Sequence, residues 1–107
     1  MSSYKWPEKD PDETADFSVD WSRFLGSDTL VSANWFIEDE NGTKTGPLSN
    51  GNTVNALQFV APSISGNVAT ARFGGGTNNL RYKTTCSITT GQGLTYERSI
   101  LLPIRER

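Results

Sequence analysis

The sequence contains no histidine and only one cysteine, Cys86. The lack of histidine removes the most common general base and the most common metal ligand of proteins. Standard zinc sites, and the Ser-His and Cys-His nucleophiles of hydrolases, therefore cannot be assembled within this chain. The lone thiol excludes an intrachain disulfide and fits synthesis in a reducing cytoplasm. We expect the protein not to be an enzyme and to hold neither a cofactor nor a metal ion.

Long apolar runs and an excess of positive charge are also missing. No strictly apolar stretch is longer than three residues, as in Ile100-Leu101-Leu102, and residues 1–20 contain no apolar run of signal-peptide length. The chain carries 10 basic and 12 acidic side chains, so no surplus of positive charge exists to bind a phosphate backbone. We expect neither nucleic acid nor a membrane as a partner, and no signal-directed export.

The sequence does have alternation, because side chains on one parity of six runs are mainly apolar. A period of two is typical of strands with one face in a core and one in water. The members are Phe17, Val19 and Trp21; Val31, Ala33, Trp35 and Ile37; Asn55, Leu57 and Phe59; Ala69, Ala71 and Phe73; Leu80, Tyr82, Thr84, Cys86 and Ile88; and Tyr96, Ile100, Leu102 and Ile104. No segment shows a helical stripe of useful length.

Turn residues separate these runs. Asn41-Gly42 is a pair favoured in two-residue hairpins, a glycine run at 74–76 ends one strand, and residues 90–93 join the last two strands. The pattern predicts an all-β fold, an immunoglobulin-like antiparallel β-sandwich of about seven strands over residues 14–107. The paired cysteines of antibody domains are absent, and Tyr82 lies four residues before Cys86 rather than two, so a tyrosine corner is not assigned.

Residues 1–13, MSSYKWPEKDPDE, combine two prolines with dense charge and no periodicity, which predicts an extended N-terminal arm. Residues 1–20 hold two basic and six acidic side chains, a net charge of −4, whereas the remainder has a net charge of +2. The acidic side chains are Glu8, Asp10, Asp12, Glu13, Asp16 and Asp20. Three interpretations apply to them, namely a solvated arm, a calcium site, and docking on a basic surface of a partner. Their spacing fits no EF-hand loop, which favours the solvated arm.

The three tryptophans differ in their surroundings. Trp21 and Trp35 lie on the core parity of their strands, so we expect them to pack in the core. Trp6 lies in the arm beside Pro7, where no strand buries it. An exposed tryptophan needs a cover, so Trp6 either folds back on the sandwich or inserts into a neighbouring subunit. Tyr4 shares these two alternatives.

Two charged groups and the thiol favour structural explanations. Glu38, Asp39 and Glu40 are adjacent at a strand end and alternate in direction, so they do not converge like a glycosidase pair. Cys86 lies on an apolar parity, which predicts a buried and inert thiol. Four basic side chains lie at outward or edge positions, where they are expected to protect strand edges and favour solubility. A more specific hypothesis is that they form a basic stripe that binds an acidic partner, such as the arm of a neighbouring copy. They are Arg72, Arg81, Lys83 and Arg98.

Two parts of the chain together resemble the phage fibre–tail adaptor proteins, which are small immunoglobulin-like virion components. The first part comprises Lys5-Trp6-Pro7, Lys9-Asp10-Pro11-Asp12-Glu13, Asp16-Phe17 and Asp20-Trp21. The second comprises Gly74-Gly75-Gly76-Thr77, Arg81-Tyr82, Ile88-Thr89-Thr90 and Glu97-Arg98-Ser99. Ala15 and Phe17 depart from the family pattern, which has Leu and Tyr there.

The resemblance implies a structural virion protein, made in the bacterial host cytoplasm, that connects tail fibres to the tail or neck in a symmetric homo-oligomeric ring. It brings no catalytic residues. The arm is part of the matched start, so we expect the interface at Tyr4, Trp6, Pro7, Asp10, Pro11, Asp12 and Glu13. The alternatives are a carbohydrate-binding or adhesive recognition module, and another head–tail completion or decoration protein.

Overall fold

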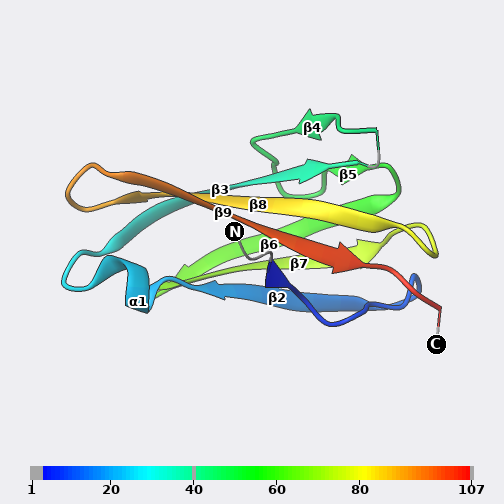
Figure 1. Ribbon diagram of the computed structural model, residues 1–107, viewed down its shortest axis with the longest axis horizontal. Helices are drawn as coiled ribbons and strands as arrows, with labels where there is room; N and C mark the ends of the chain where they lie inside the picture. Colours follow the sequence, from blue (N-terminus) through cyan, green and yellow to red (C-terminus); the bar gives the residue numbers. More distant parts are fainter. Residues whose placement is uncertain (1–3, 40, 107) are drawn as a thin grey trace.

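The computed structural model describes residues 4–39 and 41–106, which form two β-sheets and one short helix (Figure 1). The strands are β1 (Tyr4–Lys5), β2 (Thr14–Asp20), β3 (Leu30–Glu38), β4 (Lys44–Thr45), β5 (Thr53–Val54), β6 (Leu57–Ser65), β7 (Val68–Gly75), β8 (Arg81–Thr90) and β9 (Thr95–Pro103), and the helix is α1 (Ser22–Leu25). The all-β fold is confirmed. In the described part of the chain, six strands are long and three have two residues, which differs from the expected seven.

The strands are divided between two sheets that share one core. One sheet has the order β1-β9-β8-β3-β4 and the other has the order β2-β7-β6-β5. Neighbouring strands are antiparallel, except that β1 runs parallel to β9. Figure 1 shows the two layers lying one above the other, with α1 and the β8–β9 hairpin at one end and the C-terminus at the opposite end. The described residues contain no helix long and apolar enough to cross a membrane.

The core lies between the sheets, where the predicted alternation places it. Trp35, Phe59 and Phe73 come from both sheets, and their ring centroids lie 5.9–6.4 Å apart. Trp21 and Trp35 are buried, as expected. Aromatic pairs at these distances add to the free energy gained from area burial. The same parity buries most of the other predicted core positions, including Leu57, Ala69, Ile88 and Leu102.

Val31 is a predicted core residue that the structure places elsewhere. Its side chain is 59% exposed, and the preceding Leu30 is buried in its place. The β3–β8 register shifts between Leu30 and Ser32, so one extra residue is inserted into β3. Because side chains alternate along a strand, an inserted residue reverses the faces of those before it.

The β3–β4 connection is also longer than the predicted two-residue hairpin. β3 ends at Glu38 and β4 begins at Lys44. The Asp39 carboxylate accepts hydrogen bonds from the backbone N–H groups of Asn41 and Thr43, which fixes the wider loop. The Asp39 carboxylate therefore stabilises the loop backbone and is not part of a carboxylate pair. Glu40 lies outside the described residues.

Tyr82, at the start of β8, ties together two connections. Its hydroxyl donates to the carbonyl of Asn55 at 2.6 Å and accepts from the N–H of Thr77 at 3.0 Å. The ring is 1% exposed. The side chain therefore joins the loop after β7 to the turn between β5 and β6, a contact that the spacing to Cys86 did not reveal.

Cys86 is fully buried on the core face of β8. Burial raises the pKa of its thiol to about 12, and the nearby Trp21 indole and Arg98 guanidinium offset only part of this effect. The thiolate is the reactive form of cysteine. The folded protein keeps this thiol protonated and out of reach of reagents, so we expect it to be unreactive. The predicted burial of this thiol is confirmed.

We predict that replacing Tyr82 by Phe lowers the free energy of unfolding by about 1–3 kcal/mol, because the Asn55 carbonyl and the Thr77 N–H lose their shared partner. Urea denaturation measures this change. The control is Tyr96→Phe, which removes a hydroxyl from a half-buried ring and should change stability by less than about 0.5 kcal/mol. Equal effects of the two substitutions would show that the Tyr82 hydroxyl is unimportant.

We predict that Ellman's reagent at pH 8 leaves the native protein unmodified and titrates one thiol in guanidinium chloride. A raised pKa in the folded state also means that the folded state holds the thiol proton more tightly. The wild type should therefore lose stability relative to Cys86→Ala as the pH rises above about 9, up to the folded pKa of about 12. Parallel stability curves for the two proteins over this range would contradict the assignment.

Candidate interaction surface at the N-terminal segment

The N-terminal segment runs alongside the last strand. β1 pairs with Ile100 and Leu101 of β9, and beyond β1 the N–H of Trp6 donates to the Leu101 carbonyl. Further along, the Lys9 N–H donates to the Pro103 carbonyl, and the Lys9 carbonyl accepts from Arg105 N–H. In Figure 1 the dark-blue strand lies beside the red one. Residues 4–9 are thus attached to one sheet through their backbone.

Trp6 attaches the same segment to the other sheet. Its ring centroid lies 4.9 Å from that of Phe17, 5.9 Å from that of Phe73 and 6.2 Å from that of Trp35. Its indole N–H donates to the Ser18 carbonyl of β2 at 3.3 Å. Of the two alternatives for this side chain, the structure shows the one in which it folds back on the sheets. The half-buried ring lies between β9 and β2, beside a pocket of about 240 Å³ lined by residues of both strands. The Tyr4 backbone is paired with β9, but its side chain lies outside the described part.

Lys9 is a buried cation that the sequence analysis missed. Its side chain is 1% exposed, and Nζ donates to the carbonyl of Asp10 at 2.7 Å and of Gly75 at 2.6 Å. Desolvation lowers the pKa of Lys9, and the carboxylates of Glu13, Asp10 and Asp12 oppose that shift. A buried ammonium is tolerated only when polar groups replace its water. The two carbonyls fill that role here.

The glycine run explains how this contact is possible. Gly75 and Gly76 adopt positive φ angles of 67° and 97°. A Cβ atom at Gly75 would lie 2.6 Å from the Ala56 carbonyl oxygen, and one at Gly76 would lie 2.9 Å from Cγ1 of Ile104. Only glycine combines these angles with this close approach. The run ends β7, as expected, and also brings its backbone within reach of Lys9.

Residues 10–13 form a tight acidic turn. The Asp10 N–H donates to a Glu13 carboxylate oxygen, and the Asp10 carboxylate accepts from the N–H of Asp12. The Glu13 N–H closes the turn on the Asp10 carbonyl at 2.9 Å. Pro11 and Asp12 therefore lie at the apex of a hydrogen-bonded loop, with Asp12 and Glu13 exposed. Four of the seven predicted interface residues are brought together here.

The acidic side chains do not assemble a calcium site. Asp16 pairs with Arg72 at 2.8 Å, and this hydrogen bond lowers the pKa of the Asp16 carboxyl. Asp20 instead accepts from the backbone N–H of Ser22. Residues 4–39 and 41–106 contain no group of three or more His, Cys, Asp or Glu side chains placed to hold a metal ion.

The four basic side chains do not form one stripe. Arg72 lies on β7 beside Asp16, whereas the Arg98 guanidinium lies 5.0 Å from the ring centroid of Trp21 and covers the edge of the core. Lys83 is exposed on β8. Arg81, at the start of β8, lines a pocket at one end of the molecule, and Arg98 lines a different, smaller one. The hypothesis of a continuous basic stripe is therefore wrong.

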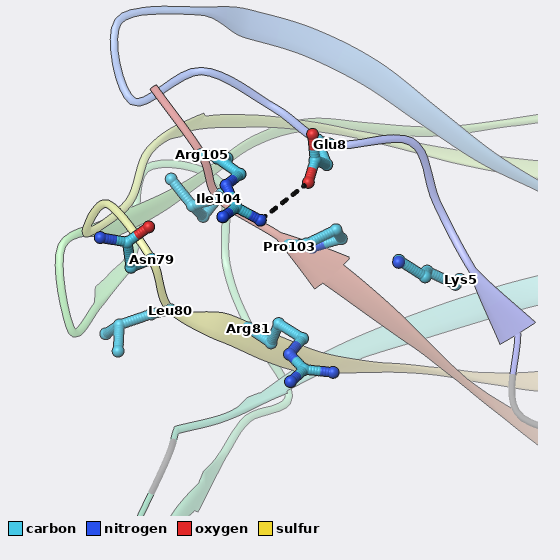
Figure 2. A pocket seen from close by; sticks show the side chains of 8 residues that line it. All are labelled: Lys5, Glu8, Asn79, Leu80, Arg81, Pro103, Ile104 and Arg105. Atoms are coloured by element: carbon cyan, nitrogen blue, oxygen red, sulfur yellow. Dashed lines mark ion pairs between the residues drawn. The ribbon is translucent and has the colours of Figure 1, made fainter. Parts of the chain in front are cut away.

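The pocket with Arg81 has a volume of about 450 Å³ and opens beside the N-terminal segment (Figure 2). Its lining residues are Lys5, Glu8, Asn79, Leu80, Arg81, Pro103, Ile104 and Arg105. Three of them are cations and one is an anion. Arg105 lies 3.7 Å from the Glu8 carboxylate, as the dashed line in Figure 2 shows. The N-terminal segment thus has an acidic turn and also borders a basic pocket.

Comparison with known proteins gives one family. A family model described as "Podophage GP4 fiber-tail adaptor protein gp77" matches residues 9–103, nearly the whole chain. No curated protein has a significant match to this chain. The family match confirms the resemblance found in the sequence. It spans both the Lys9–Glu13 turn and the glycine run that meets it.

We predict that Lys9→Met lowers the free energy of unfolding by about 1–3 kcal/mol, because the carbonyls of Asp10 and Gly75 lose their donor. Chemical denaturation measures the loss. Lys83→Met removes the same charge from an exposed position and should cost no more than about 0.5 kcal/mol. Indistinguishable results for the two variants would mean that the Lys9 contact does not stabilise the fold.

Proposed function

We propose that the chain, which belongs to the podophage GP4 fiber-tail adaptor family, connects tail fibres to the tail or neck through protein–protein contacts in a symmetric ring. The family is one of structural tail proteins, which is not an enzyme class. The observation that carries the proposal is the match over residues 9–103. The lack of histidine agrees with a role built on contact rather than catalysis.

We further propose that the fold is an immunoglobulin-like sandwich. The orders β9-β8-β3 and β2-β7-β6 correspond to the strand orders GFC and BED of immunoglobulin domains. The Tyr82 hydroxyl bonds to the backbone at Thr77, five residues upstream, as in a tyrosine corner. These two features support the assignment without a disulfide.

The proposed docking element is the segment of residues 1–13, with contacts at Tyr4, Trp6, Pro7, Asp10, Pro11, Asp12 and Glu13. Pro7, Asp12 and Glu13 are exposed, and the turn that holds the acids is closed by three hydrogen bonds. A surface that is already ordered loses little conformational entropy on binding. Anchoring by Trp6 and Lys9 therefore favours a rigid contact.

In a ring, weak individual contacts are sufficient to hold the subunits together. When one interface repeats around a closed symmetric assembly, each subunit is held on both sides. A fibre that engages several subunits gains from effective concentration rather than from a large single interface. Moderate contacts by a small domain are therefore compatible with stable attachment.

The carbohydrate-binding alternative needs a flat aromatic platform. The exposed aromatic Phe24 lies 4.7 Å from Tyr96, but the ring planes meet at 65°. Two rings at this angle do not present one stacking surface to a sugar. The geometry therefore favours protein contact over glycan recognition.

We predict that phage particles made without this protein have tails that lack fibres, as seen by negative-stain electron microscopy. Supplying the wild-type protein should restore fibres, whereas Pro7→Arg combined with Asp12→Arg should restore fewer, because both changes alter the exposed docking segment.

Ser65→Arg is the control, because Ser65 is exposed at the β6–β7 hairpin, at the opposite end of the molecule from the acidic turn (Figure 1). It should restore fibres fully. Particles that carry fibres without the protein, or protein found only on the head, would contradict the adaptor role and favour decoration or head completion.

A further inference from the structure

We propose that the basic pocket of one copy receives the acidic turn, residues 10–13, of a second copy, with Asp12 pairing with Arg81 and Lys5. This inference rests on the proposed ring. It specifies which two surfaces of the chain meet at each repeat. Both surfaces belong to the described residues, so both sides of the contact can be altered.

The pocket side carries positive charge that the chain itself does not neutralise. Lys5 and Arg81 are exposed, and neither makes an ion pair with another described residue. Arg105 is held by Glu8, so the lining has a net charge of +2. In Figure 2, Lys5 lies to one side of Pro103 and Arg81 lies below it. Lys5 and Arg81 line the same pocket, so a carboxylate that enters it meets positive charge.

The turn side presents such a carboxylate in a fixed position. Asp10 and Glu13 use their carboxylates to close the turn, whereas Asp12 lies at its apex and accepts no hydrogen bond or ion pair from the rest of the described chain. Asp12 is exposed. It is therefore a preorganised anion that is near the Lys9 charge but forms no ion pair.

Within one copy, the acidic turn forms no ion pair with the basic pocket. Lys9 Nζ bonds to the Asp10 carbonyl and to Gly75, which fixes the base of the turn against the glycine run. With its base fixed there, Asp12 makes no ion pair with Lys5 or Arg81 of its own chain. Two rigid surfaces of opposite charge on one molecule favour association with a second copy. Rotation about a ring axis repeats the contact between successive copies.

The test measures self-association of the full chain by sedimentation velocity and native mass spectrometry at low and physiological salt. Arg81→Glu alone and Asp12→Lys alone should each weaken association about tenfold or more, because attraction becomes repulsion. Association of the wild type should fall as salt screens the contact. Arg23→Glu is an equal charge reversal at an exposed position on α1, at the opposite end of the molecule (Figure 1), and should match the wild type.

The decisive experiment combines the two charge reversals in one chain. The double variant Arg81→Glu/Asp12→Lys should associate like the wild type, because the charges are exchanged but still complementary. An equimolar mixture of the two single variants should also associate, since each offers the surface that the other needs. Failure of both rescues would overturn this contact.

The outcome is separable from that of the adaptor proposal. If the wild type associates and Arg81→Glu has no effect, the turn–pocket contact is wrong and a ring is built from other surfaces. If the wild type stays monomeric at low salt and high concentration, the contact is also overturned. Fibre attachment in the particle experiment then decides the adaptor role independently.

Discussion

The path of the N-terminal segment depends on the burial of one charge, the ammonium group of Lys9. A cation removed from water needs polar partners, and Lys9 finds them in the carbonyls of Asp10 and Gly75. This requirement fixes the segment against the end of β7 and sets the base of the acidic turn. Trp6 provides the apolar counterpart, because its ring occupies the gap between the two sheets. Residues that look like a solvated tail in the sequence are therefore part of the folded body.

This arrangement suits an adaptor. A tail component has to present the same surface in every copy, and a flexible extension would present many. The turn that carries Asp12 is closed by its own hydrogen bonds, and Lys9 holds the base of the turn in place. The sheets supply a stiff support, and the side chains of Asp12 and Glu13 are exposed on the turn.

The strands were predictable because alternation is a local property of the sequence. It located the buried faces of β2, β7, β8 and β9 without knowledge of their partners. Val31 was misplaced because a bulge leaves no mark in the hydrophobic pattern. Lys9 was missed for a different reason, since a lysine among acids and prolines reads as solvated charge. The glycine run was the available signal, because glycine often marks close approach of another group. Which group approaches the glycine run depends on a contact between residues more than sixty positions apart in the chain. Local sequence patterns do not encode such contacts. The interface itself stays a prediction.

The parallel pairing of β1 with β9 has a mechanical consequence. Because the two strands are parallel, the N-terminal end of β1 and the C-terminal end of β9 lie at opposite ends of the pair. A pull on these two strand ends in opposite directions therefore acts along the strands and loads in shear the backbone hydrogen bonds of Trp6, Lys9 and Arg105. Bonds loaded in this way share the force, whereas those of a hairpin pulled open at its end break one after another. This geometry suits a tail component that bears load along the two strands.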